Sequence, residues 1–539
     1  MSENRAKDIT TQLWDMANQL RSNMNPVDFQ SYILGFMFYR YLSTHQEHFL
    51  KDQGFFEIKP DQTINDAYTE AAKRDGVDDY LKAISTDCGY AIKPEDTWTT
   101  IVDKVNNGTI VPEDFQNMFS HFNENANLNH EFKKDFRNVF SDIHLGDNQL
   151  GNSTNERAKA LSKIVSLVDQ FNYNDKNGHD ILGDVYEYLI ANFASNSGKK
   201  AGEFYTPHQV SEVLAKIVTL NLKQNDDTFT VYDPAMGSGS LLLTVQSNVP
   251  NGDQKGKVHF YGQELNTTTY NLARMNLMMH NVNYKNMDLR NGDTLSIDWP
   301  DGRDQNGVDH PRSVDAVVEN PPYSAHWDNN SKRIKDPRFS EYAIAPKTKA
   351  DYAFLLHGLY HLNNQGTMAI VLPHGVLFRG AKEAKIRKAL LDKNQIDAVI
   401  GLPPKLFYST SIPTLIMVLK RNRKNRNVLF IDASRDYKKG KNQNLLTADN
   451  IDKIVQTYKQ RKNVKRYAHV TSMDEIKEND YNLNIPRYVD TFVPEPDINI
   501  DEVKNNIKDI DQKITKTKKE LKSMEADLIW TDKNKDQGN

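Results

Sequence analysis

The chain has 539 residues, 26% of them charged, and a mean hydropathy of −0.69, which predicts two or three domains in the cytoplasm, with no signal peptide and no membrane-spanning segment. Its single cysteine, Cys88, excludes an internal disulfide and a thiolate cluster, and no paired Cys/His spacing occurs, so we expect no metal. The near balance of 68 basic and 72 acidic residues is unlike a protein that grips phosphates over its whole surface.

The first part of the chain has a helical pattern from about Ile9 to Val168. Apolar residues such as Phe29, Ile33 and Phe36 recur at intervals of three and four, and strand-like alternation is scarce. We therefore predict an N-terminal helical domain over residues 1–168.

The middle of the chain alternates between helical patterns and short apolar runs from about Gly183. Such alternation is typical of a parallel, doubly wound α/β sheet, and we predict a Rossmann-like domain over residues 169–490. The expected strands are 229–232, 258–261, 314–318, 367–372 and 398–402.

The end of the chain, residues 491–539, is predicted to form a separate helical tail. Apolar residues between Val503 and Leu528 are spaced alternately by four and three, as in the seam of a coiled coil. Two interpretations stay open, a helix that docks a partner and an ordinary amphipathic helix that packs on its own domain.

A glycine-rich turn follows the first expected strand, in the sequence Asp233-Pro-Ala-Met-Gly-Ser-Gly-Ser240. Gly237 and Gly239 allow a sharp turn and close approach of a ligand, and the helix that begins near Leu241 offers unpaired N–H groups. Glycine serves packing in many α/β folds, so this turn alone does not identify a ligand.

Two acidic residues add to this turn. Glu264 ends the second expected strand, where a carboxylate can accept from ribose hydroxyls, and Asp293 lies in a later turn, where it can accept from an adenine amine. Asp293 by itself is equally explained as a cap of its turn. Together the three features favour a nucleoside ligand, and the absence of a GxxxxGK[ST] sequence argues against ATP in a P-loop.

A second constellation is Asn320-Pro321-Pro322-Tyr323, which directly follows an apolar strand. The side-chain oxygen of Asn320 and the carbonyl of Pro321 can accept the two N–H bonds of an aryl amine, which orients its lone pair for attack on a sulfonium methyl. Tyr323 offers a face for stacking a flipped base. The alternative is a purely structural Asn-Pro-Pro turn.

These segments, with Gly202-Glu-Phe-Tyr-Thr-Pro-His-Gln-Val210 before them, resemble the motifs of amino-group DNA methyltransferases, with the cofactor motif first. The nearest family is the modification subunit of type I restriction-modification systems. The resemblance implies transfer of a methyl group from S-adenosyl-L-methionine to N6 of adenine, with N4 of cytosine as the alternative acceptor. The implied cofactor contacts are Glu203, Phe204, Tyr205, Thr206, Pro207, His208, Asp233, Gly237, Ser238, Gly239, Ser240, Glu264 and Asp293, and the implied catalytic residues are Asn320, Pro321, Pro322 and Tyr323.

The resemblance also implies partners. No base-reading module is evident after Asp432, so recognition of double-stranded DNA is expected to rest on a specificity subunit, with two copies of this chain for each. A separate restriction subunit would supply the motor and the nuclease. Methyltransferases that act on protein glutamine or RNA bases share the Asn-Pro-Pro-Tyr chemistry and are the competing class.

Overall fold

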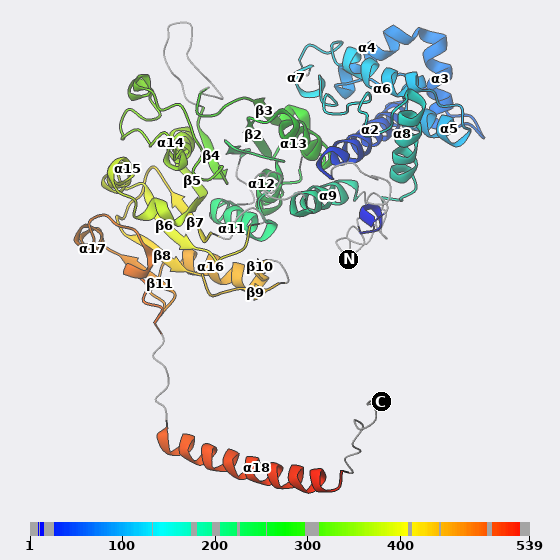
Figure 1. The fold of residues 1–539 in the computed structure, drawn as a ribbon. Helices are drawn as coiled ribbons and strands as arrows, with labels where there is room; N and C mark the ends of the chain where they lie inside the picture. The colour runs from blue at the N-terminus through cyan, green and yellow to red at the C-terminus, as the bar shows by residue number, and fades with distance from the viewer. Residues whose placement is uncertain are drawn as a thin grey trace, which may run out of the picture. The chain divides into compact units, whose positions relative to one another are not determined.

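The structure is a computed structural model, drawn as a ribbon in Figure 1. It describes residues 9, 11–15, 26–131, 133–173, 181–196, 205–223, 227–254, 256–296, 312–407, 412–440, 443–492 and 499–528. The chain divides into two compact units, Met1–Asp490 and Thr491–Asn539. Among the described helices, none combines the length and the apolar character that crossing a membrane requires.

The first unit begins with helices that pack around an aromatic core. The capping residues Thr63 and Ser153 accept from backbone N–H groups in the first turn of α3 and α8, which fixes where these helices begin. Tyr39 of α2 packs against Phe119 and Phe140 with ring centroids 5.7 and 5.6 Å apart. The helices are α2 (Pro26–Asp52), α3 (Ile64–Asp75), α4 (Val77–Cys88), α5 (Trp98–Asn106), α6 (Pro112–Asn125), α7 (Lys133–Phe136), α8 (Thr154–Asp169) and α9 (Leu182–Asn196).

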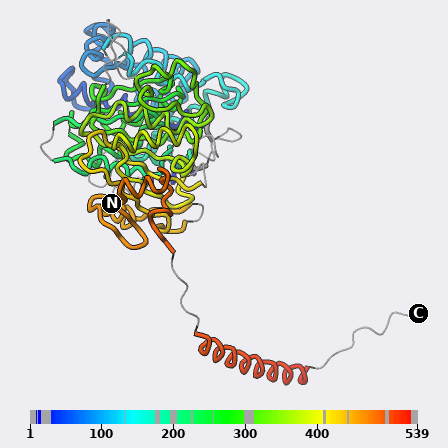
Figure 2. The backbone as a smooth tube through the Cα atoms, turned by 90° about the vertical axis from the view of Figure 1, so that its left-hand side faces the viewer, coloured from blue at the N-terminus to red at the C-terminus, as the bar shows by residue number. Residues whose placement is uncertain are grey.

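The rest of this unit is built on a sheet of nine strands in the order β11-β8-β6-β7-β5-β4-β1-β2-β3. Figure 2 follows the chain through the unit, from the blue helices to the orange segments. The strands are β1 (Phe229–Asp233), β2 (Val258–Glu264), β3 (Met287–Asn291), β4 (Val314–Glu319), β5 (Leu362–Pro373), β6 (Ile396–Gly401), β7 (Thr414–Leu419), β8 (Val428–Asp432) and β11 (Ala468–Thr471), with a separate pair β9 (Lys438–Lys439) and β10 (Asn444–Leu445).

Helices cover both faces of the sheet, which confirms the predicted doubly wound α/β class. Val231 of β1 and Val318 of β4 face one core, and the alternating residues Tyr232 and Val317 face the other. The first core is closed by α11 (His208–Val218), α12 (Ser240–Asn248), α13 (Thr267–Met279) and α16 (Ala448–Gln460), and the second by α14 (Asp351–His361), α15 (Ala381–Asp392) and α17 (Met473–Glu478).

The sheet is mixed, whereas the sequence predicted a parallel one. β7 runs antiparallel to both β5 and β6, and β11 runs antiparallel to β8. A strand parallel to β6 would need a crossover connection back to the end of the sheet where β6 begins. The described residues between Gly401 and Thr414 contain no helix for such a crossover, and β7 pairs antiparallel.

Arg274 of α13 joins the helical region to the sheet region within this unit. Its buried guanidinium donates to the backbone oxygens of Lys134, Asp135 and Arg137 at distances between 3.0 and 3.2 Å. The Tyr41 hydroxyl donates to the oxygen of Met278 at 2.7 Å. Because α13 also carries part of the first core, these contacts tie the N-terminal helices to the strands that form the site.

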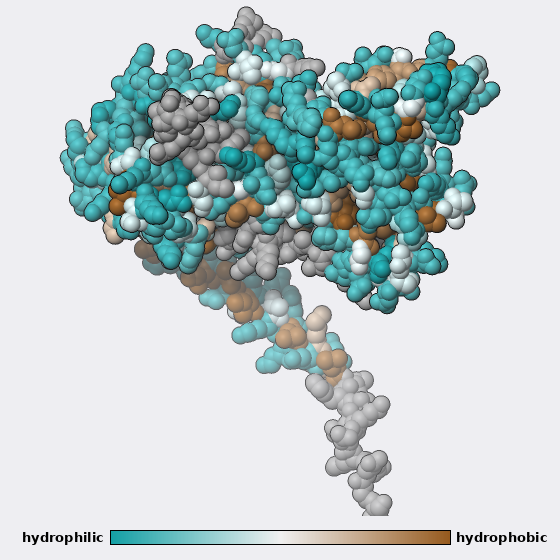
Figure 3. Space-filling model, turned by 90° about the horizontal axis from the view of Figure 1, so that it is seen from above, coloured by the Kyte–Doolittle hydropathy of each residue, from teal (hydrophilic) through white to brown (hydrophobic). Residues whose placement is uncertain are grey.

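The second unit contains α18 (Ile500–Ala526), which confirms the predicted C-terminal helix. None of its residues is buried, and apolar side chains recur along it (Figure 3). The seam residues Val503, Ile507, Ile510, Ile514, Leu521 and Met524 are 43–69% exposed. Within its own unit, therefore, no described residue covers the apolar seam of this helix.

Candidate active site

A cavity of about 550 Å³ opens at the carboxyl ends of β1, β2 and β4. Parallel strands of an open sheet bring the loops that follow them to this edge, where α/β proteins bind ligands. Its lining residues are Thr206, Asp233, Pro234, Ala235, Met236, Gly237, Ser238, Ser240, Leu241, Glu264, Leu265, Asn266, Thr267, Asp293, Thr294, Asn320, Pro322 and Phe354.

The turn between β1 and α12 forms one wall of the cavity. Gly237 and Gly239 have φ angles of 55° and 78°, in the left-handed region that favours glycine. A Cβ on Gly239 would lie 2.3 Å from a methyl of Leu277, so this glycine is needed for packing and does not line the cavity. Ser238 and Ser240 are buried and bring their hydroxyl oxygens within 3.1 Å of each other.

Glu264 connects this turn to the end of β2. Its carboxylate accepts from the backbone N–H of Gly237 at 3.2 Å and from that of Asn266 at 2.8 Å. Burial raises the pKa of the Glu264 carboxyl, whereas these two N–H donors act to lower it. The carboxylate thus braces the turn and still lines the cavity.

Asp293 lies on the same side of the cavity, in the turn after β3. It accepts from the Leu295 backbone N–H at 3.0 Å and from the Ser296 hydroxyl at 2.5 Å. These are the bonds of a turn cap, yet the residue also lines the cavity beside Thr294. Both interpretations of Asp293 from the sequence are compatible with this position.

The Asn-Pro-Pro-Tyr turn begins where β4 ends. Asn320 and Pro322 line the cavity, whereas Pro321 is buried and is not part of the lining. The Asn320 amide nitrogen donates to the Thr206 hydroxyl at 2.9 Å, and the Asn320 oxygen accepts from the Tyr323 hydroxyl at 2.7 Å. Both polar ends of the asparagine side chain are therefore engaged.

Tyr323 is only partly exposed and does not line the cavity. Its ring meets that of Phe407 edge-on, with centroids 6.1 Å apart. Burial raises the pKa of its hydroxyl, which therefore stays protonated and can donate to Asn320.

The residues before α11 and at its start do not all lie at the same cavity. Glu203 and Phe204 lie outside the described residues, and Tyr205 and Pro207 are buried. Thr206 lines the cavity, but His208 lines a second cavity of about 560 Å³, together with His280. The structure thus brings Thr206, and not His208, to the wall that holds Glu264 and Asn320.

Sequence reasoning missed several residues of the site. Thr294, Met236 and Phe354 line the cavity, and Glu319 ends β4 directly before Asn320. Both carboxyl oxygens of Glu319 are buried without a hydrogen-bond partner, and burial beside Asp233 raises its pKa well above the ordinary value. An acidic residue at the end of the run Val314–Glu319 was the available signal.

Asp233 is also buried at the base of the cavity. Burial raises the pKa of its carboxyl to about 8, although the backbone N–H of Ala235 donates to it at 3.0 Å and acts against the shift. Asp233 and Glu319 are therefore two acidic groups that favour the protonated form beside the site.

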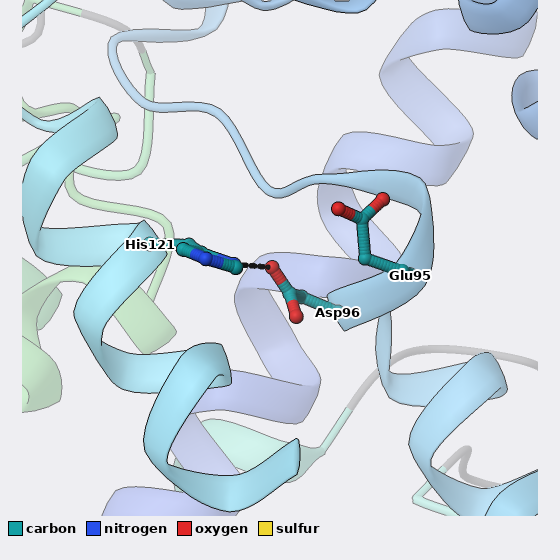
Figure 4. Close-up of side chains that lie close together, drawn as sticks. All are labelled: Glu95, Asp96 and His121. Atoms are coloured by element: carbon teal, nitrogen blue, oxygen red, sulfur yellow. Dashed lines mark hydrogen bonds and ion pairs between the residues drawn. The ribbon is translucent and has the colours of Figure 1, made fainter. Parts of the chain in front are cut away.

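Among the described residues, one group outside the cavity has donors suited to a metal, namely Glu95, Asp96 and His121 in the helical region. Figure 4 shows the His121 ring directed at Asp96, while the Glu95 carboxylate points away from that pair. The His121 Nδ1 atom lies 2.7 Å from a carboxylate oxygen of Asp96. This contact joins α6 to the short turn Pro94–Asp96, which gives the pair a structural role. That the protein needs no metal stays a prediction.

Comparison with known proteins matches nearly the whole chain. Residues 177–496 match the family described as N-6 DNA Methylase, and residues 9–168 match the HsdM N-terminal domain. The chain is 35% identical to the type I restriction enzyme MpnII methylase subunit of Mycoplasma pneumoniae, over 97% of this chain and 95% of that protein. It is 31% identical to the MjaVII methylase subunit of Methanocaldococcus jannaschii, over 72% of this chain and 66% of that protein.

A solved structure agrees with these sequence matches. The type I restriction-modification system methyltransferase subunit from Streptococcus thermophilus superposes with a TM-score of 0.80 at 42% identity. The match covers 90% of this chain and 100% of that chain, so it includes both the helical region and the sheet region.

Proposed function

The chain belongs to the family of methyltransferase subunits of type I restriction-modification systems, and from this premise we propose that it transfers a methyl group from S-adenosyl-L-methionine to N6 of adenine in double-stranded DNA. The modified base would protect the host DNA from the restriction activity of the same system. The observation that carries this proposal is that Asn320 and Pro322 line the same cavity as Glu264 and Asp293.

The cavity suits a nucleoside cofactor in size and in chemistry. Its volume of about 550 Å³ falls within the roughly 300–1,000 Å³ of small-molecule sites. We assign the ribose hydroxyls to Glu264 and the adenine amine to Asp293, since carboxylates are acceptors for both groups. When bound, S-adenosyl-L-methionine supplies an electrophilic methyl on a sulfonium centre.

The catalytic residues would act on the acceptor amine. An adenine amine donates two N–H bonds, and the Asn320 oxygen together with the Pro321 carbonyl provides two acceptors that hold its lone pair toward the cofactor. The Asn320 oxygen accepts one bond from the Tyr323 hydroxyl, and because an amide oxygen has two lone pairs it can also accept from the incoming amine. The Tyr323 hydroxyl would keep Asn320 in place while the face of its ring stacks on the flipped base.

Thr206 would orient the side chain of Asn320. The sequence assigned it to the cofactor, but its hydroxyl accepts from the Asn320 amide nitrogen at 2.9 Å. With its nitrogen held there, the amide presents its oxygen to the acceptor base. We therefore assign Thr206 to the orientation of Asn320 as well as to the cavity wall.

Partners would supply recognition of the DNA sequence. We propose that a specificity subunit binds the exposed seam of α18 and that two copies of this chain join each specificity subunit, with a restriction subunit completing the assembly. Support comes from the uncovered seam and from the family of the chain. The same family and the polar composition support a cytoplasmic protein with domains 1–168, 169–490 and 491–539.

The direct test is to incubate the chain and its specificity subunit with DNA and methyl-labelled S-adenosyl-L-methionine, and then to identify the labelled nucleoside. We expect label in N6-methyladenine and far less label with the Asn320→Ala variant. Label in N4-methylcytosine would correct the acceptor. Label confined to protein or RNA would contradict the proposal.

A further inference from the structure

Arg338 is a large, fully buried side chain of the segment that joins the Asn-Pro-Pro-Tyr turn to α14. Asp336 accepts from its Nε at 2.9 Å and from its Nη2 at 2.7 Å, which is the bidentate geometry of a strong ion pair. Burial of an arginine requires such compensation, because its charge cannot be removed by deprotonation. The ion pair accounts for only one edge of the guanidinium.

The other edge reaches the turn that forms the Asp293 side of the cavity. Nη1 donates to the oxygen of Thr294 at 2.9 Å, and Nη2 donates to the oxygen of Leu295 at 3.3 Å. Thr294 lines the cavity, and its hydroxyl donates to the oxygen of Pro234 at 2.6 Å. Arg338 therefore fixes the residues directly after Asp293 and, through Thr294, the turn after β1.

A second chain of bonds leads from Arg338 toward Glu264. Nη1 lies 3.0 Å from Nδ1 of His357, and since arginine only donates, that nitrogen must accept. Nε2 of His357 then carries the proton and donates to the Tyr232 hydroxyl at 2.8 Å. Burial and the nearby cation lower the pKa of His357, in keeping with this neutral ring.

The Tyr232 hydroxyl connects His357 to the end of β2. It donates to the side-chain oxygen of Gln263 at 3.3 Å, one residue before Glu264. The backbone oxygen of Gln263 also accepts from the N–H of Met236 at 3.0 Å, so the same residue holds the glycine turn. Hydrogen bonds thus link Arg338 to the turn after β3, to the turn after β1 and to the end of β2.

We propose that Arg338 is a positioning residue for the adenosine half of the cofactor, acting through the turn at Asp293 and through Gln263 on Glu264. The inference rests on the proposed function, because it takes the ligand of this cavity to be S-adenosyl-L-methionine. Arg338 is not among the lining residues of the cavity, so we expect it to act indirectly, on affinity for any ligand that carries adenosine. A lysine cannot replace it fully, since one ammonium cannot span Asp336, Thr294 and His357 in the fixed plane of a guanidinium.

The experiment is calorimetric titration of the full chain with S-adenosyl-L-methionine and with 5′-methylthioadenosine, which lacks the amino-acid half. We expect Arg338→Met to weaken both ligands by about tenfold or more and Arg338→Lys by less, because buried acceptors lose their partner. Tyr232→Phe should weaken both by about threefold, since it breaks only the branch to Gln263.

Arg387→Met is the matched control. Arg387 is equally buried and donates to the oxygens of Val376, Arg379 and Tyr481, none of which lines the cavity. Its loss should lower thermal stability but change both affinities by less than about twofold. If Arg338→Met does not fold, Arg338→Lys and Tyr232→Phe carry the test.

Wild-type affinity in both Arg338→Lys and Tyr232→Phe would overturn the inference, as would an equal loss in Arg387→Met. A loss for S-adenosyl-L-methionine with no loss for 5′-methylthioadenosine would also overturn it, because the effect would then lie at the amino-acid half. Failure of the wild-type chain to bind either ligand would instead contradict the proposed function.

Discussion

The Met1–Asp490 unit and helix α18 use the same apolar periodicity in opposite ways. In α11 the repeating apolar residues, such as Val213, Leu214 and Ile217, are buried against the sheet. In α18 an equally regular series, including Ile510 and Ile514, is exposed within its unit. A pattern that predicts burial is therefore buried in the first unit, whereas no described residue of the second unit covers it there.

The proposed chemistry and the proposed contact with a specificity subunit involve different units of the chain. The cavity with Asn320, Glu264 and Asp293 belongs wholly to the first unit. We infer that each proposed function can be damaged without loss of the other.

The largest expected effect is on chemistry alone. Asn320→Ala removes one of two acceptors for the amine, so methyl transfer by the complex should fall by about 10²–10³-fold or more. Calorimetric affinity for S-adenosyl-L-methionine should stay near that of the wild type, because this side chain is assigned to the acceptor. Asn127→Ala, at an exposed helix end, is the control. Equal loss of transfer and cofactor affinity would contradict the assigned role.

The second-largest expected effect is on binding of the chain to the specificity subunit. The double variant Ile510→Asp with Ile514→Asp should weaken binding to the specificity subunit by about 100-fold, since it places two charges on an apolar seam. Asn505→Asp with Gln512→Asp adds the same charge on the opposite side of α18 and should bind like the wild type. Co-purification and calorimetry measure this, and equal loss in both double variants would exclude the seam as the contact.

A smaller effect is expected when the hydrogen bond between Thr206 and Asn320 is removed. Thr206→Val keeps the shape of the side chain but removes the acceptor for the Asn320 amide nitrogen, so kcat should fall by about tenfold. Thr206→Ser should retain most of the activity. If valine changes only the KM for S-adenosyl-L-methionine, Thr206 serves the cofactor, as the sequence predicted.

The smallest effect concerns Asp233 and the stability of the first unit. Its pKa rises from an ordinary value near 4 to about 8, so the folded state holds a proton that the unfolded state releases between these values. Stability from this group is therefore highest below about pH 4 and is lost progressively as the pH rises toward 8.

Asp233→Asn should remove that dependence. The thermal midpoint of the ligand-free wild-type chain should fall more steeply between pH 6 and pH 8 than that of the variant, by a few degrees. Parallel profiles for the two proteins would mean that Asp233 is ionised throughout this range.

Local pattern was enough to predict the fold class and the turns of the site. Asp233, Glu264 and Asn320 each end or follow a buried strand, and parallel strands bring such ends to one edge. The strands β3, β7, β8 and β11 of the sheet were not predicted individually, and the antiparallel direction of β7 depends on a connection that composition does not reveal.

Contacts distant in sequence were beyond prediction. Arg338 donates to Thr294 across 44 residues, and Thr206 accepts from Asn320 across 114 residues. The resemblance to the methyltransferase motif grouped His208 with Thr206, but α11 begins at His208, which lines the other cavity. The roles assigned to individual cofactor and catalytic residues stay predictions.

We propose that this chain binds the cofactor and carries out methyl transfer, whereas a partner subunit recognises the DNA sequence. The most direct measurement compares the chain alone with its complex with the specificity subunit, for affinity toward S-adenosyl-L-methionine and for methyl transfer to DNA. The account predicts similar cofactor affinity in both samples and N6-methyladenine only in the complex. Sequence-specific methylation by the chain alone, or cofactor binding that appears only with the partner, would contradict it.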